Sequence, residues 1–265
     1  MQAVTLFGVP ATQRTLGVRV VATPVTVSLP DPPGGKMPDA VRVLSRWIDP
    51  SELRLGGGIV LAARWHHRNS TDLDFLATGD AIDTLFYQDL DGVLQDMVNL
   101  AKAGVIGSET MRETNRTVLH FDVGGTPVSI GRVGFHDDLQ REVESRTNVL
   151  LSPTRDILTK KMVNRFLVNG LPTERDAFDF LVAQTKAPED LKYAWLQVPA
   201  PDRNTLAAAY RERSLRWTGA SDARLLANLA YAELANELWL HAHRMMESNL
   251  EYVPIGSAGK GSHER

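Results

Sequence analysis

The stretch that decides the fold is Leu55 to Phe75, LGGGIVLAARWHHRNSTDLDF. It begins with glycines at 56–58, continues into an apolar run that is compatible with a helix, and ends with two carboxylates, Asp72 and Asp74. This order predicts a glycine loop, then a helix, then a strand.

Both ends of the stretch suggest chemistry. The backbone at Gly57 and Gly58 can approach a bulky anion because glycine has no Cβ, and a helix that starts there points its N–H groups at that anion. Asp72 and Asp74 in a strand would share one face, since the side-chain period is two. Neighbouring carboxylates repel unless a cation lies between them, and oxygen ligands favour Mg²⁺ bridged to substrate phosphates. Either pattern alone is also common in ordinary loops and strand edges, and that alternative stays open.

The same stretch resembles the signature of the abortive-infection nucleotidyltransferase toxins, the AbiEii group of the DNA polymerase β-like superfamily. The matching residues are Gly57-Gly58, Leu61-Ala62, His67-Arg68, Ser70 and Asp72-Leu73-Asp74-Phe75. The chain departs from that signature at Ile59 and Val60, where the group usually has threonine and alanine, so one hydroxyl contact is missing. The resemblance implies a metal site at Asp72 and Asp74, and nucleotide-binding residues Gly57, Gly58, Arg68 and Ser70.

A second block, residues 157–179, carries charges at helical spacing. Ser152 and Pro153 predict a helix that runs to about residue 168, and Thr173 is a plausible N-cap of the next helix. By spacing alone, the charged residues would form a surface ion-pair network between these helices: Lys161, Arg165, Asp176 and Asp179.

This block also resembles the second conserved region of the AbiEii group. The matching residues are Ile157-Leu158, Lys161-Met162, Arg165, Arg175-Asp176 and Asp179. By this resemblance the catalytic residues are Asp72, Asp74, Lys161 and Asp176. Lys161 and Arg165 would bind the nucleotide, with Lys161 as a point charge on the triphosphate. Asp176 would orient Lys161 or assist deprotonation of the acceptor hydroxyl.

A third metal ligand is the missing part of this pattern. Strands are expected at 115–123 and 126–133, joined by a Gly124-Gly125 turn. Nucleotidyltransferase folds commonly carry a third acid beside the Asp-x-Asp strand, but Ser129 stands there. Asp122 could substitute or be a solvated edge carboxylate, and otherwise substrate or water would complete the shell.

Composition limits the classes of protein that fit. The chain has 265 residues, 43% of them hydrophobic, which is enough for a core and one or two domains. Its net charge of −3 gives no bulk signature of a nucleic-acid binder, although Arg211, Arg213 and Arg216 could contact RNA. The absence of cysteine excludes disulfides and thiolate metal sites and fits a cytoplasmic location. We find neither a signal-peptide pattern nor an apolar run of about twenty residues, and we expect no membrane segment.

The expected fold class is α+β, with a nucleotidyltransferase-like mixed sheet flanked by helices and a C-terminal helical domain. Residues 187–203 are expected to form an irregular interdomain loop. The predicted divisions are an N-terminal extension at 1–35, the nucleotidyltransferase core at 36–150, a helical domain completing the active site at 151–255, and a flexible tail at 256–265.

The function implied by the resemblance is transfer of a nucleoside monophosphate from an NTP, with Mg²⁺ as cofactor. The chain would be the toxin of a toxin–antitoxin or phage-defence pair, with tRNA as acceptor and an antitoxin carrying a winged-helix DNA-binding domain as partner. One alternative is a nucleotidyltransferase with a protein or small-molecule acceptor, such as an aminoglycoside antibiotic. Another is a catalytically inactive relative that binds nucleotide or a partner.

Overall fold

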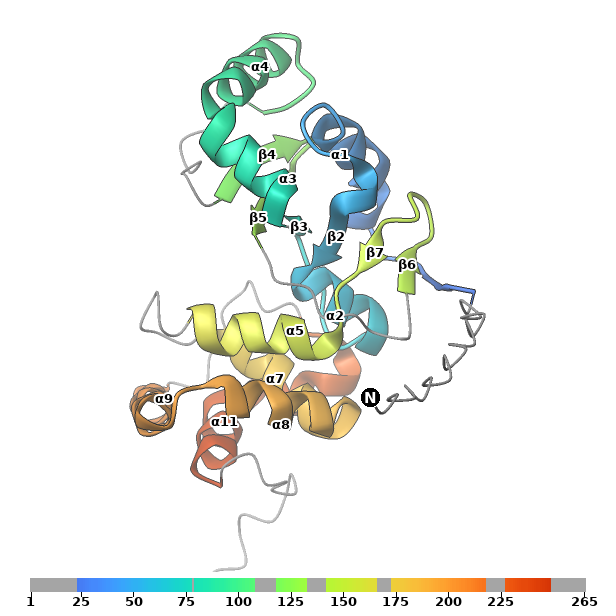
Figure 1. Cartoon of the computed structure of the whole chain (residues 1–265). Coiled ribbons are helices and arrows are strands. Elements are labelled where there is room, and N and C mark those ends of the chain that lie inside the picture. Colours follow the sequence, from blue (N-terminus) through green and yellow to red (C-terminus); the bar gives the residue numbers. More distant parts are fainter. Residues whose placement is uncertain are drawn as a thin grey trace, which may run out of the picture.

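The computed structural model describes residues 23–77, 79–107, 118–132, 142–165, 173–217 and 227–248, with only the backbone described at Asn164 and Arg165. In Figure 1 the sheet lies in the upper part of the molecule with α1, α3 and α4, and the helices from α5 onward form the lower part. Helix α2 lies between the two parts.

The described residues form a seven-stranded mixed sheet in the order β1-β6-β7-β2-β3-β5-β4. The α+β class with a mixed sheet flanked by helices is therefore confirmed. The strands are β1 (Val25–Val27), β2 (Leu53–Gly56), β3 (Leu73–Ala77), β4 (Val118–Val123), β5 (Thr126–Arg132), β6 (Glu142–Glu144) and β7 (Leu150–Leu151).

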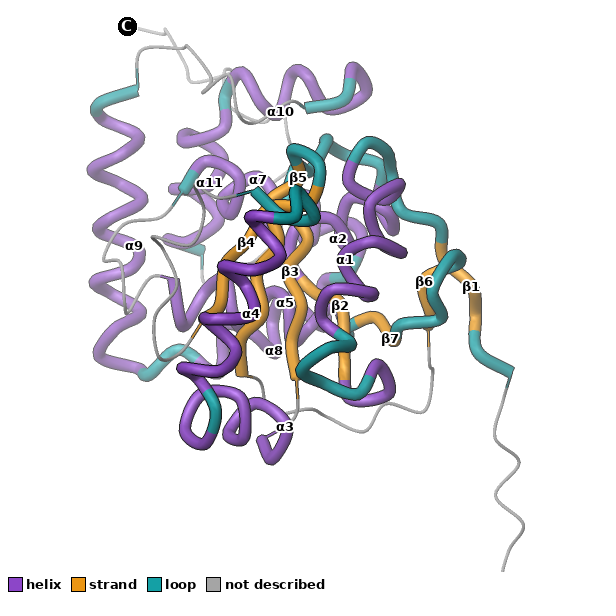
Figure 2. Tube along the Cα trace, turned by 90° about the horizontal axis from the view of Figure 1, so that it is seen from above, coloured by secondary structure: helices purple, strands orange, loops and turns teal. Residues whose placement is uncertain are grey.

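Helices α1 and α4 lie in front of the strands in Figure 2, and the helices before β4 come first in the chain. They are η1 (Pro33–Lys36), α1 (Met37–Leu44), η2 (Pro50–Glu52), α2 (Gly57–Trp65), α3 (Gly79–Asp83), the π-helix η3 (Thr84–Gln88) and α4 (Leu90–Lys102). The later helices are α5 (Thr154–Thr159), the π-helix η5 (Lys160–Arg165), α7 (Glu174–Lys186), α8 (Pro188–Gln197), α9 (Ala200–Leu215), η6 (Leu229–Tyr231), α10 (Ala232–Asn236) and α11 (Leu238–Glu247).

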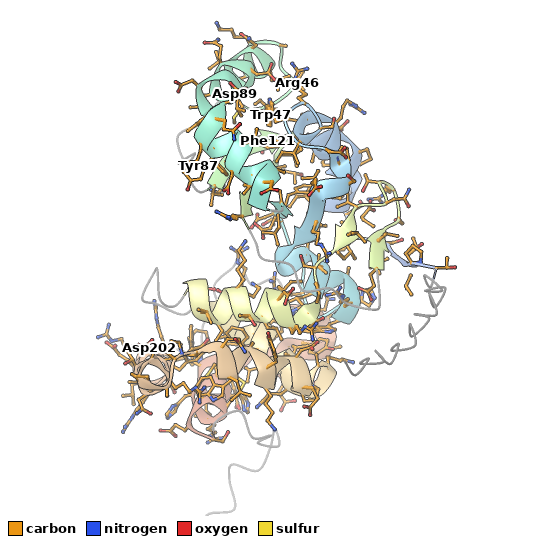
Figure 3. All side chains as sticks on the ribbon, in the orientation of Figure 1. Arg46, Trp47, Tyr87, Asp89, Phe121 and Asp202 are labelled. Atoms are coloured by element: carbon orange, nitrogen blue, oxygen red, sulfur yellow. The ribbon has the colours of Figure 1, made fainter. Side chains whose placement is uncertain are left out.

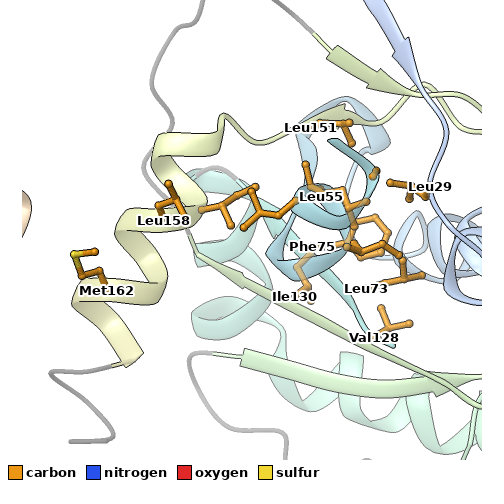
Figure 4. Close-up of a cluster of buried hydrophobic side chains, with 14 of the residues drawn as sticks. Leu29, Leu55, Leu73, Phe75, Val128, Ile130, Leu151, Leu158 and Met162 are labelled. Atoms are coloured by element: carbon orange, nitrogen blue, oxygen red, sulfur yellow. The ribbon is translucent and has the colours of Figure 1, made fainter. Parts of the chain in front are cut away.

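Strand register separates an apolar row from a polar one. Leu55 pairs with Phe75, Phe75 with Ile130, and Ile130 with Leu119, and all four side chains are buried. Figure 4 shows three of them within the hydrophobic cluster. Because successive side chains of a strand point to opposite faces, Asp74 faces away from this core. The hydrophobic core therefore fixes the direction of that carboxylate.

Helix α1 is joined to its neighbours by polar contacts at its end. The guanidinium of Arg46 donates two hydrogen bonds to Asp96 of α4, and the indole N–H of Trp47 donates to the same carboxylate. The Trp47 ring also meets Phe121 edge-on, with 6.2 Å between the ring centroids (Figure 3). These contacts join the end of α1 to α4 and pack it against strand β4.

Two expectations about local structure were wrong, and a third was right only in part. Ser152 makes no capping hydrogen bond, because α5 starts at Thr154 with Pro153 in the N-cap position. After Thr159 the α-helix gives way to the π-helix η5; residues 166–168 of the expected helix lie outside the described residues. Residues 187–203 are mostly helical, since Pro188 and Pro201 occupy first turns, where a missing N–H costs nothing.

Strand β1 belongs to the predicted extension 1–35 and pairs in parallel with β6, so the described part of that range adds a strand to the sheet. The predicted division at 150/151 falls within β7, which pairs with β2, and the division itself stays a prediction. No helix in the described part of the chain combines the length and apolar character that a bilayer crossing needs.

Candidate active site

The carboxylate of Asp74 lies against the glycine turn that starts α2. Asp74 pairs with Gly56 on one side and Ser129 on the other, and the Ser129 hydroxyl donates to Asp74 Oδ1 at 2.8 Å. A Cβ added to Gly57 would lie 2.0 Å from Asp74 Oδ2, and the φ of Gly57 is +70°. Position 57 therefore requires glycine both for its backbone conformation and for the approach of this carboxylate.

If the chain carries out the nucleotidyl transfer that the sequence predicts, replacing Gly57 with alanine is expected to lower its rate at least tenfold, because the methyl group would displace Asp74 and a misplacement of about 1 Å can cost about 100-fold. Gly104 is a matched control, since its φ is +69° and an added Cβ would meet nothing within 4 Å. Gly104→Ala carries the same backbone strain without the clash. Equal transfer rates of the two variants would contradict a role for this approach.

The glycine next to it serves a different purpose. A Cβ added to Gly58 would lie 2.3 Å from Arg68 Nη2, so this glycine gives room to a buried guanidinium. Helix α2 begins at Gly57 with no side chain capping its N–H groups. Its N-terminus is thus compatible with the anion-binding role predicted for the glycines.

Asp72 immediately precedes β3 and is partly exposed. Its Oδ1 accepts a hydrogen bond from the Thr71 hydroxyl at 2.6 Å, and its Oδ2 lies 3.4 Å from Arg175 Nη1. The intervening Leu73 is fully buried. Leu73 lies in the core and both acids lie outside it, but only Asp74 belongs to the strand, so the expected shared face of the two acids stays a prediction.

A buried charge network, which comprises His67, Arg68, Lys161, Asp176 and Asp179, joins the two sequence blocks. Arg68 donates to both oxygens of Asp179, at 2.7 and 2.9 Å, and the His67 Nε2 lies 2.7 Å from the same carboxylate. Lys161 Nζ lies 2.6 Å from Asp176 and 3.1 Å from Asp179. All five residues are buried. The expected ion pairs of Lys161 with Asp176 and Asp179 therefore exist, but they are buried and not at the surface, and the side chain of Arg165 lies outside the described residues.

The ionisation of Asp179 follows from these neighbours. Burial alone would raise the pKa of Asp179, but the charges of Arg68 and Lys161, with hydrogen bonds from Arg68 and His67, hold it well below its usual value. Burial also lowers the pKa of His67, against the opposing effect of Asp179. We therefore assign a neutral His67 with its Nε2–H donating to Asp179. The network then holds two cations and two carboxylates.

Lowering the pH is expected to destabilise the protein through His67. The unfolded chain protonates this histidine at about pH 6.5, whereas the folded chain resists protonation because the His67 pKa is lowered. The free energy of unfolding should fall as pH drops below about 6.5, by up to about 1.4 kcal/mol per pH unit until the folded pKa is reached. Denaturant titrations of wild type and His67→Gln between pH 7.5 and 5.5 test this. An equal loss in both proteins would contradict the assignment.

Helix α7 brings the two blocks together at its first turn. Arg175 contacts Asp72, and the next residue, Asp176, contacts Lys161. The Thr173 side chain caps this helix by accepting from the Asp176 N–H, as predicted. Asp176 is thus placed to orient Lys161, and the roles of both residues stay predictions.

Three predicted nucleotide contacts also stay predictions. Arg68 donates from all three guanidinium nitrogens to protein acceptors, Asp179 and the Asn69 carbonyl, and this geometry favours an anchoring function. Ser70, two residues after Arg68, is buried. The Arg165 side chain lies outside the described residues.

The donor set fits a cation held by two carboxylates. Among the described residues no three His, Cys, Asp or Glu side chains are grouped so as to hold a metal ion. Asp122 is used elsewhere, since its Oδ1 accepts the Gly125 N–H at 2.8 Å in the β4–β5 turn. Mg²⁺ commonly takes one or two carboxylates and completes its shell with phosphate oxygens and water. Asp72 and Asp74 match that pattern.

Sequence reasoning missed the central position of Asp179 and the contact between Arg175 and Asp72. A signal for Asp179 was present in the sequence, because it is the only acid in the apolar run AFDFLVA at 177–183, and the structure buries α7 continuously from residue 176 to residue 183. Acids within such a segment require partners. The contact of Arg175 had no comparable signal, since it joins residues 103 positions apart.

No protein-family model matches the chain, and no curated protein matches it. Among solved structures it is similar to JHP933 from Helicobacter pylori, at 16% identity over 81% of this chain and 91% of that chain, with a TM-score of 0.41. A second solved structure, of an H. pylori protein proposed to be a nucleotidyltransferase, is 16% identical over 83% of this chain and 96% of that chain, with a TM-score of 0.41. The antibiotic-resistance factor ANT(2'')-Ia is 14% identical over 68% and 95%, with a TM-score of 0.40.

Proposed function

We propose that the chain is a Mg²⁺-dependent nucleotidyltransferase that moves a nucleoside monophosphate from an NTP onto an acceptor hydroxyl. The observation that supports it most is the Asp74 carboxylate lying against the Gly57 turn at the start of α2. A phosphate-binding backbone and a metal-binding acid would there share one small space. Asp72 and the first turn of α7 border the same region.

In this reaction the acceptor oxygen forms a bond to the α-phosphorus while the bond to the pyrophosphate oxygen breaks. The acceptor proton passes to a base or to water. Catalysis of this kind depends mainly on positioning and on stabilising the charge of the phosphates. When bound between Asp72 and Asp74, Mg²⁺ would supply positive charge to the α-phosphate and the leaving group.

The chain's own groups would position the nucleotide. N–H groups at Gly57 and Gly58 would hold phosphate oxygens, with the Ser70 hydroxyl as a further donor. Lys161 would face the triphosphate as a point charge, oriented by Asp176. Since Lys161 is paired with two carboxylates in the nucleotide-free protein, its approach to a phosphate requires a shift of its amine within the network.

For the acceptor we propose a tRNA, and for the biological role the toxin of a cytoplasmic toxin–antitoxin or phage-defence pair. Both follow from the resemblance of the two sequence blocks to the AbiEii group. The partner would be an antitoxin with a winged-helix DNA-binding domain.

Incubation of the purified chain with each α-³²P-labelled NTP and Mg²⁺ tests the proposal. Acceptors are offered in parallel: total tRNA, total protein and a set of aminoglycosides. Label on tRNA that is lost with EDTA supports the proposal in full. Label on protein or on an aminoglycoside would show that the acceptor is not tRNA, while the proposed nucleotidyl transfer would stand. No transfer to any acceptor, with no nucleotide-dependent rise in Tm, would overturn the proposed activity.

A further inference from the structure

Arg175 stands in an electrostatically unfavourable place for a helix residue. It lies in the first turn of α7, where the helix dipole is positive and carboxylates are favoured. The helix therefore gains nothing from this cation. Its described carboxylate contact is Asp72, with Nη1 3.4 Å from Oδ2.

The contact between Arg175 and Asp72 is loose compared with the buried charge network. It involves one nitrogen at 3.4 Å, and the two side chains are 31% and 36% exposed. Arg68, by contrast, is buried and donates hydrogen bonds to Asp179 from two nitrogens. A single, partly exposed ion pair contributes little to stability and can exchange partners.

A cation bound to Oδ2 of Asp72 would weaken this contact, because metal and guanidinium would share one oxygen. Its Oδ1 accepts from the Thr71 hydroxyl, and its Oδ2 is the oxygen that faces Arg175. A metal ion that takes Oδ2 would compete directly with the guanidinium. The backbone of Arg175 is meanwhile held by α7, whose next residue is tied to Lys161 and to Thr173.

We infer that Arg175 is an exchangeable partner of Asp72 that moves to the nucleotide. In the nucleotide-free protein it neutralises Asp72; when metal and NTP bind, the guanidinium leaves Asp72 and donates to the triphosphate oxygens. Guanidinium and phosphate match in geometry and form strong bidentate contacts. The inference rests on the proposed function and assigns to that same site a phosphate-binding residue and a release step.

Two measurements of opposite sign test the inference. Mn²⁺ binding without nucleotide, measured by electron paramagnetic resonance, should become about two- to fivefold tighter in Arg175→Gln, because the competitor for Asp72 is gone. The KM for NTP should rise about tenfold in the same variant, because a charge-assisted contact to phosphate is lost. Arg175→Lys should keep Mn²⁺ binding near the wild-type value and recover only part of the KM.

Arg42→Gln is the matched control, since Arg42 is an exposed residue of α1 in an i,i+3 pair with Asp39. It should change neither quantity. A purely structural role of Arg175 would lower Tm without separating the two effects. Unchanged Mn²⁺ affinity or unchanged KM in Arg175→Gln overturns the inference while the proposed function stands. Wild-type protein that neither binds Mn²⁺ nor transfers a nucleotide overturns both.

Discussion

Asp74→Asn is expected to reduce nucleotidyl transfer on the order of 10²- to 10³-fold, as loss of a group that stabilises transition-state charge does. Asparagine keeps the size of the side chain and an oxygen that can accept from the Ser129 hydroxyl. It removes the negative charge that would hold the metal. The fold should persist, because asparagine has the same size as aspartate and can keep the contact with the Ser129 hydroxyl.

The rate is measured with labelled NTP at saturating acceptor, with Tm recorded alongside. Asp122→Asn is the matched control, because it makes the same chemical change in the same sheet at an acid that accepts from the β4–β5 turn. We expect near wild-type transfer from it. Ser129→Ala should lower the rate about tenfold, the effect of losing a group that orients a metal ligand. Wild-type transfer by Asp74→Asn would remove Asp74 from the catalytic set.

Asp179→Asn is expected to cost about 3–5 kcal/mol in the free energy of unfolding, because it leaves buried cations without their shared carboxylate. Arg68 and Lys161 both contact Asp179, and His67 donates to it. The variant should melt roughly 10 °C or more below wild type. Denaturant titration at pH 7 measures the loss directly.

The exposed Asp39 gives the matched comparison, since Asp39→Asn breaks only a surface pair with Arg42 and should cost less than about 1 kcal/mol. The difference in the free energy of unfolding between wild type and Asp179→Asn should also become smaller in acid. The lowered pKa of Asp179 gives stability that is present above the unfolded value of about 3.9 and is lost as pH falls through the folded value. A loss below about 1 kcal/mol at pH 7 would show that the network is not held by this carboxylate.

Much of the site's local structure was accessible from sequence because its signals are short-range. The helix after the glycines and the strand at Leu73–Ala77 appear where the pattern of residues 55–75 predicts them. Ser129 lies opposite Asp74 on the neighbouring strand, at the position where a third acid was missing. Capping by Thr173 likewise depends only on residues three apart.

The helices α8 and α9 and the π-helix η5 could not be predicted from the sequence. Proline near residues 188 and 201 suggested a loop, yet both occupy first turns of helices. Burial of Leu191, Ala194 and Trp195 stabilises α8 more than local propensity opposes it. The change from α5 to a π-helix before Lys161 has no signature that we recognise in the residues themselves.

The sequence by itself determined the glycine turn, the acid strand and the charged faces of the later helices, because each depends on contacts between residues a few positions apart. Only the tertiary structure decided which charges meet. Asp179 was assigned to a helix surface. It lies instead in the interior, where it pairs with Arg68 and Lys161 and accepts a hydrogen bond from His67. Pairing across such distances follows from burial, since a charge removed from water must take whichever opposite charge the packed core places beside it.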